Sequence, residues 1–194
     1  MIRKVVIPLV FLVLAITANC EEPYLGFFDA IGTDLAYRAL GTAFGEPWQP
    51  EFHIVEMCFP PLSKCAPRFP LGRYLMLGLR IAQVARYFAS NGECHWGWSF
   101  LVPSLAIPII YTGREIREGI EHFLILNTRW SWWNTLGPSR LRISLEYNLV
   151  LFYQVFVGLM VGTDINYGKT SYPEPNLFIG VSFKYGWTRP EALM

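Results

Sequence analysis

The stretch at residues 176–187 constrains the fold of this chain more than any other feature. Its odd positions carry Leu, Ile, Val, Phe, Tyr and Trp, whereas its even positions are mostly small or polar. Successive side chains of a β-strand point to opposite faces, so one face of this stretch is wholly apolar. That face ends in Tyr185 and Trp187, which are typical of the boundary between membrane and water. The pattern predicts a strand that spans a bilayer and borders a narrow, wet interior.

Two preceding stretches, 141–149 and 155–167, alternate in the same way. Five others complete an expected set of eight strands, an even number that brings both ends of a barrel to one side: 31–39, 51–59, 74–88, 96–111 and 120–133. The alternation is weaker in 51–59, 96–111 and 120–133. In the stretches around 31–39 and 74–88, the residues expected on the inner face are Ala30, Gly32, Asp34, Ala36, Arg38, Met76, Gly78, Arg80 and Ala82.

The beginning of the chain has the three parts of a secretory signal. Arg3 and Lys4 precede the apolar run 5–18, which a short small-residue stretch follows. We expect a signal peptide at 1–20 and a single barrel domain at 21–194. Cleavage after residue 18, an uncleaved anchor and acylation of Cys20 remain alternatives.

The composition supports a membrane-embedded chain. Hydrophobic residues make up 53% of it and charged residues only 16%, where an ordinary domain has about 25% charged residues. The longest apolar stretch after the signal, 100–111, contains two prolines and is shorter than the roughly 18 residues of a spanning helix. Backbone in lipid must satisfy its own hydrogen bonds, so a closed barrel remains. Export then predicts a bacterial outer membrane.

Partners and cofactors are expected to be few. No basic block recommends nucleic acid as a partner. The three histidines, His53, His95 and His122, are scattered, so neither a metal nor another cofactor is expected. Cys58 and Cys65 flank a Pro-rich connection and are predicted to form a disulfide in an oxidising compartment. Two unpaired thiols are the alternative.

Charged residues on the inner faces predict a network inside the barrel. A turn centred near residue 153 places Arg142 opposite Asp164 and Glu146 opposite Met160. A loop centred near 172 places Met160 opposite Lys184. The full set expected in this network is Arg142, Asp164, Glu146, Lys184, Asp34, Arg38 and Arg80. Eight strands leave an interior about wide enough for side chains to fill, so paired charges are expected to close it.

In this pattern the chain resembles the small eight-stranded outer-membrane barrels, the class of the OmpA membrane domain, OmpX and OmpW. The last strand resembles the signal that the barrel-assembly machinery reads, through Ile179, Val181, Phe183, Tyr185 and Trp187. The chain departs from that signal in one respect: seven residues follow Trp187, so the aromatic residue is not the last of the chain. The resemblance implies a monomer surrounded by outer-membrane lipid, with the assembly machinery as its partner during biogenesis.

The function expected is a structural or weakly permeable role in the envelope, with a largely plugged polar lumen. Alternatives are a pore for small solutes, a lipid-modifying barrel enzyme and a secreted lipocalin-like barrel, whose faces would be inverted. An enzyme is not expected. His95 and Ser99 stand about 13 Å apart on a strand, too far for a nucleophile–base hydrogen bond.

Overall fold

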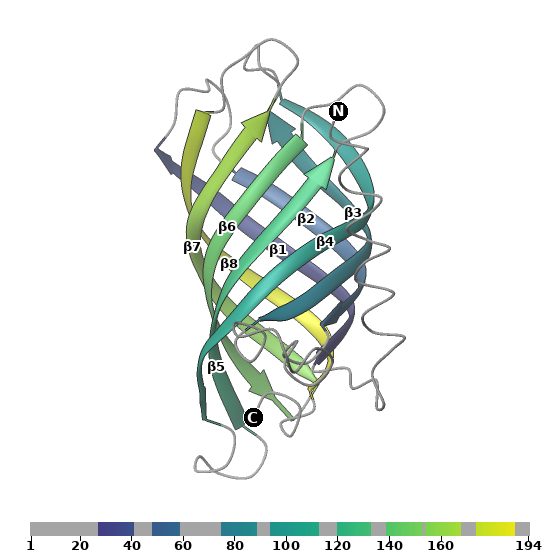
Figure 1. The fold of residues 1–194 in the computed structure, drawn as a ribbon, viewed down its shortest axis with the longest axis vertical. Helices are drawn as coiled ribbons and strands as arrows, with labels where there is room; N and C mark the ends of the chain where they lie inside the picture. The colour runs from purple at the N-terminus through teal and green to yellow at the C-terminus, as the bar shows by residue number, and fades with distance from the viewer. Residues whose placement is uncertain are drawn as a thin grey trace, which may run out of the picture.

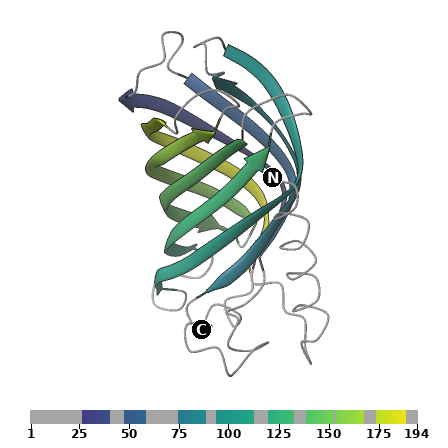
Figure 2. The ribbon, with the colours of Figure 1, turned by 45° about the horizontal axis from the view of Figure 1, so that its top comes forward.

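The computed structural model describes residues 27–40, 48–58, 75–88, 94–112, 120–132, 139–152, 154–167 and 174–188. They form eight strands: β1 (Phe27–Leu40), β2 (Trp48–Cys58), β3 (Met76–Phe88), β4 (Cys94–Thr112), β5 (Ile120–Trp132), β6 (Ser139–Leu151), β7 (Val155–Tyr167) and β8 (Glu174–Thr188). Each strand pairs antiparallel with the next, and β1 also pairs with β8, which closes the barrel (Figures 1 and 2). The all-β, eight-stranded antiparallel barrel is confirmed. Within these residues no helix is long and apolar enough to cross a membrane.

The boundaries differ most for β1 and β2, which begin at Phe27 and Trp48, four and three residues before their predicted starts. The residues assigned to a signal peptide, 1–20, lie outside the described residues.

The register is correct for one of the two predicted hairpins. Arg142 pairs with Asp164 and Glu146 with Met160 across β6 and β7. Across β7 and β8, however, Met160 pairs with Gly180, and Lys184 pairs with Phe156. The prediction that Met160 lies opposite Lys184 is therefore wrong.

The physical reason for this error lies at the start of β8. The predicted strand begins at residue 176, yet Pro175 already pairs with Ile165 within the β7–β8 ladder. A proline is tolerated at the first residues of a strand, where a missing N–H costs little. The ladder is consequently centred two residues earlier in the chain than predicted.

The regular alternation breaks at one level of the barrel in four adjacent strands. Val55 and Leu101 have left-handed backbones, with φ of 52° and 51°. The ladders of the described strands skip the pairs Ala30–Val55, Val55–Ile81 and Ile81–Leu101. At this level each strand has two consecutive side chains that are exposed or half-buried, flanked by buried ones. We call this row, Ala30, Val55, Ile81 and Leu101, the bulge row.

The bulge row corrects two predicted inner positions. Asp29 is fully buried, whereas Ala30 is half-buried and Ile31 is exposed. Likewise, Gln83 is buried in place of Ala82, which is half-buried. At this row each strand has one residue outside the alternation, while the register of the three ladders stays the same on both sides. Strict alternation therefore predicts the wrong face on one side of the row.

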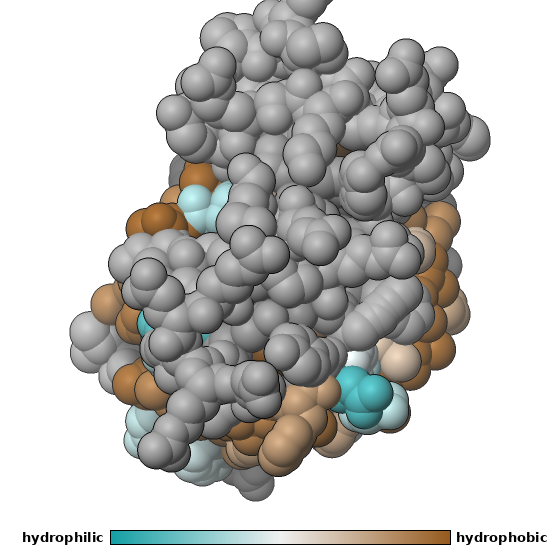
Figure 3. Space-filling model, turned by 90° about the horizontal axis from the view of Figure 1, so that it is seen from below, coloured by the Kyte–Doolittle hydropathy of each residue, from teal (hydrophilic) through white to brown (hydrophobic). Residues whose placement is uncertain are grey.

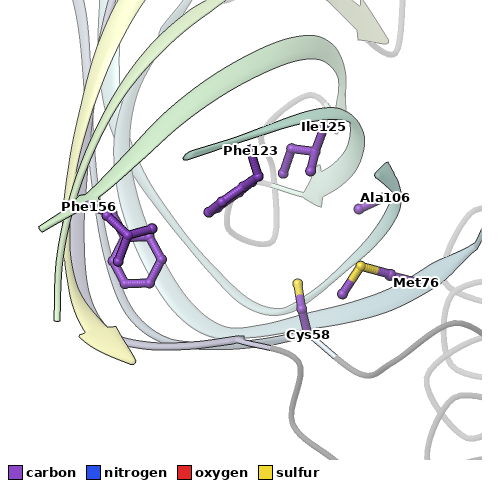
Figure 4. Packing of buried hydrophobic residues seen from close by; sticks show 7 residues of the cluster. Cys58, Met76, Ala106, Phe123, Ile125 and Phe156 are labelled. Carbon is purple, nitrogen blue, oxygen red and sulfur yellow. The ribbon is translucent and has the colours of Figure 1, made fainter. Parts of the chain in front are cut away.

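An apolar cluster fills one end of the interior: Cys58, Met76, Ala106, Phe123, Ile125, Val150 and Phe156. It lies where β2, β4 and β6 end and β3, β5 and β7 begin. Figure 4 shows these side chains converging from different strands. Phe123 and Phe156 meet edge to face, with ring centroids 6.3 Å apart. The rest of the interior holds the buried charged residues, together with a smaller apolar cluster of Ala36, Met160 and Phe178.

The outside of the barrel is apolar. Where described residues are visible at the margin of Figure 3, they are mostly brown, which marks hydrophobic residues. Aromatic side chains gather on the outside at the end opposite the apolar cluster. Tyr37 contacts Trp48 edge to face at 5.0 Å between ring centroids, and Trp130 stacks on Tyr167 at 6.3 Å.

Candidate functional site

The candidate site is the charged interior of the barrel, where six acidic and six basic side chains of the described residues are buried. They are Asp29, Asp34, Glu51, Glu56, Glu146, Asp164, Arg38, Arg80, Arg129, Arg140, Arg142 and Lys184. Isolated charges in such a place would be very costly, because they lose their hydration. Their arrangement must therefore supply partners for each, and the matching numbers allow this.

Glu51 on β2 is the centre of this arrangement. Its carboxylate accepts hydrogen bonds from Arg80 on β3 and from Arg140 and Arg142 on β6. The Arg142 Nη1–Glu51 Oε2 distance is 3.4 Å. One carboxylate thus connects two strands that are not neighbours in the barrel wall.

Arg142 makes the most regular ion pair in the interior. Its Nε and Nη2 donate to the two oxygens of Asp164, each at 2.8 Å. The guanidinium also lies over the ring of Phe178, 4.6 Å from the centroid. Two parallel hydrogen bonds and a ring face fix the orientation of this side chain.

A second group lies around Arg80 and Arg129. Arg80 Nη2 is 2.8 Å from Glu56 Oε2 and 3.6 Å from Asp34 Oδ2. Arg129 reaches the same two acids, at 3.3 Å to Asp34 Oδ2 and 3.5 Å to Glu56 Oε1. These pairs connect β1, β2, β3 and β5 across the interior.

Glu146 on β6 extends the network towards β8. Its Oε1 accepts hydrogen bonds from Ser144 Oγ at 2.7 Å and from Asn127 and Arg129 at 3.3 Å each. Its Oε2 is 3.9 Å from Lys184 Nζ. The Glu146–Lys184 pair therefore exists despite the shifted β7–β8 register, because a long lysine side chain spans the difference.

Asp29 and His53 differ from the other members of the interior in their hydrogen bonding. Asp29 Oδ2 is 3.6 Å from Lys184 Nζ, and His53 Nε2 is 3.6 Å from Glu56 Oε2. Neither oxygen of Asp29 and neither ring nitrogen of His53 has a hydrogen-bond partner among the described residues. With Glu56 they form the one group found among the described side chains that could hold a metal ion.

All seven residues predicted for the network are buried on the inside, including Arg38. Sequence reasoning missed five other charged members: Asp29, Glu51, Glu56, Arg129 and Arg140. Arg129 carried a signal, since it alternates with outward residues between Asn127 and Ser131. The bulge row hid Asp29 and Glu56, because it changes which positions face inward.

The other predicted residues lie as follows. Cys58 is buried and forms no disulfide within the described residues; Cys65 is outside them. On β8, Ile179, Phe183 and Tyr185 are exposed by 57%, 50% and 51%, and Val181 is half-buried on the same outer face. The side chain of Trp187 is outside the described part of the structure.

Comparison of the chain with family models, with curated proteins and with solved structures gave no match.

Proposed function

We propose that this protein is a small integral outer-membrane barrel, exported by a signal peptide, whose lumen is plugged by its charge network. Its role is structural, or that of a poor conduit for small solutes. One observation carries the proposal: no Asp, Glu, Lys or Arg with a described side chain is exposed. Twenty-two large apolar side chains in the described part are exposed instead.

A water-facing surface does not have this composition. The surface of a soluble protein carries most of its charged residues, and large contiguous apolar patches are rare on it. Here the apolar side chains cover the outside of a closed sheet, while the charges fill the inside. Such an apolar exterior is stable when it is surrounded by lipid. A secreted ligand-binding barrel needs the reverse arrangement, with the apolar face inside.

The aromatic side chains support the same orientation in a bilayer. Trp48, Trp96 and Trp98 are exposed by 47%, 54% and 49% at the barrel end opposite the apolar cluster. Trp98 also packs on Phe100 at 5.1 Å between ring centroids. A belt of tryptophan and tyrosine at one end is typical of the membrane–water interface.

Two features favour a closed lumen over an open pore. The ion pairs extend from β1 to β8, and the apolar cluster of seven side chains occupies the end below them. A barrel of eight strands has about enough interior volume for its own side chains. Solute passage then requires breaking the charge pairs.

The full-length protein tests the membrane assignment. Expressed in a Gram-negative host, it should be recovered in the outer-membrane fraction and should stay monodisperse only in detergent. The folded barrel should also migrate differently on gels before and after boiling. A monodisperse protein in plain buffer would contradict the proposal.

A further inference from the structure

The group Asp29, His53 and Glu56 lies in the polar interior, where each side chain is at most 1% exposed. A ligand atom of each lies within 4.8 Å of a ligand atom of the others. We infer that these three residues form a binding site for a divalent first-row transition metal ion, for which Zn²⁺ is the representative. This inference goes beyond the proposed function and does not depend on it.

The bulge row brings these three side chains to one face. His53 and Glu56 are three residues apart, so on a regular strand they would point to opposite sides. The left-handed backbone at Val55 turns both inward. On β1 the irregularity between Asp29 and Ile31 turns Asp29 inward beside them. Bulges re-aim side chains in this way next to functional sites.

Gly32 makes the space for the imidazole. A Cβ at this position would lie 2.3 Å from Cε1 and 2.4 Å from Nε2 of His53. The ring is therefore packed directly against the β1 backbone. The irregular backbone of the bulge row and Gly32 thus position a histidine and two carboxylates together, each buried.

The donor atoms suit a transition metal. Zinc binds imidazole nitrogen and carboxylate oxygen at about 2.0–2.2 Å, which places tetrahedral ligands about 3.4 Å apart. His53 Nε2 and Glu56 Oε2 are 3.6 Å apart. Both oxygens of Asp29 and both ring nitrogens of His53 are buried without a hydrogen bond among the described residues. A cation would bind a carboxylate oxygen and the one imidazole nitrogen that carries a lone pair.

Two cations compete with a metal ion for this site. Arg80 Nε and Nη2 donate to Glu56 Oε2 at 3.3 and 2.8 Å. The Lys184 ammonium lies 3.6 Å from Asp29 Oδ2, and Glu146 Oε2 is available to it at 3.9 Å. An ion bound by Asp29 takes the place of Lys184 there, and Lys184 keeps Glu146. Removing the lysine charge should therefore strengthen metal binding.

The test measures zinc on the untagged, refolded full-length protein, by elemental mass spectrometry after removal of free ion and by calorimetric titration with Zn²⁺. We expect one ion per chain. His53→Ala and Asp29→Asn should each weaken binding by at least about tenfold. His122→Ala, which removes a half-buried imidazole tilted against the Tyr147 ring at 5.8 Å between centroids, should leave zinc binding unchanged.

Lys184→Met separates a metal site from a merely structural cluster. We expect tighter zinc binding, which damage to the fold would not produce. Zinc content below one-tenth of an ion per chain in the unmodified protein would overturn the inference and leave a buried water or an ion-pair cluster. Stoichiometric zinc in a folded His53→Ala or Asp29→Asn protein would overturn it too. If one of these variants fails to fold, the other and Lys184→Met decide.

Discussion

At the scale of single residues, the interior depends on side chains that satisfy several partners at once. Glu51 contacts three arginines, and Arg142 contacts both Asp164 and Glu51. Removing one member leaves the others buried without a partner. Such a loss is costlier than the net contribution of the pair itself.

Arg142→Met should destabilise the barrel by about 3–5 kcal/mol, because it leaves Asp164 buried and unpaired. Urea unfolding of the refolded protein in micelles, followed by tryptophan fluorescence, measures the loss. The double variant Arg142→Met/Asp164→Leu removes both charges and should recover part of it. A double variant less stable than the single would contradict this account.

Two glycines on β7 differ in what surrounds them. A Cβ at Gly162 would lie 2.1 Å from the backbone oxygen of Ile143, which cannot move aside. A Cβ at Gly158 would meet Ser182 Oγ at 2.2 Å and Asn148 Oδ1 at 2.6 Å, which are side-chain ends. Gly162→Ala should cost roughly 1–3 kcal/mol and Gly158→Ala less. The same unfolding measurement ranks them, and the reverse order would refute the argument.

At the scale of elements, the bulge row decides which residues of β1 to β4 enter the interior. It relies on a β-branched residue, Val55, in the left-handed region, where L-residues other than glycine lose roughly 1–2 kcal/mol. The β2–β3 ladder is regular on both sides of Val55, at Ile54–Ala82 and Glu56–Arg80. These pairs hold the left-handed conformation of Val55 in place.

Val55→Gly should therefore leave stability unchanged or raise it by up to about 1 kcal/mol, since glycine adopts this backbone without strain. The neighbouring Ile54→Gly is the matched control, as Ile54 is exposed on the same outer face. It should lose about 1 kcal/mol or more, because its backbone is an ordinary strand. If Val55→Gly and Ile54→Gly lowered the urea midpoint of unfolding equally, the backbone of Val55 would not be strained.

Strand β8 tests the outward face directly. Phe183→Lys places a charge where a lipid-facing side chain is proposed, at a cost of about 2–4 kcal/mol near the bilayer centre. Phe152→Lys is the control, because Phe152 lies in the turn between β6 and β7 and is exposed by 79%. Outer-membrane levels and the gel shift on boiling should fall for Phe183→Lys only. Equal levels of both variants would mean that β8 does not face lipid.

At the scale of the whole molecule, the closed barrel turns local alternation into an inside and an outside. Planar-bilayer recording of the unmodified protein should show no porin-like conductance, because the charge network and the apolar cluster fill the lumen. Glu146→Ala/Lys184→Ala should raise the leak, since it removes a charge pair and opens space. It should also lower stability. Large, steady conductance in the unmodified protein would make a channel the leading function.

The sequence was sufficient to predict eight strands and the face of most residues on β6, β7 and β8. Both depend on a period of two, which is local to each strand. It also placed Arg142 opposite Asp164, because a short turn leaves little freedom in register. The predicted β7–β8 register was wrong, because β8 begins at Glu174 and already includes Pro175.

Alternation along the chain was thus enough to predict a barrel with polar residues inside and apolar residues outside. Which charges meet depends on the three-dimensional fold. Glu51 finds Arg80, Arg140 and Arg142 across the interior, and Asp29 joins His53 and Glu56 through the bulge row. These contacts depend on barrel closure, on register and on irregular backbone at a few residues. None of these leaves a periodic signal in the chain, because each arises from strands packing against one another.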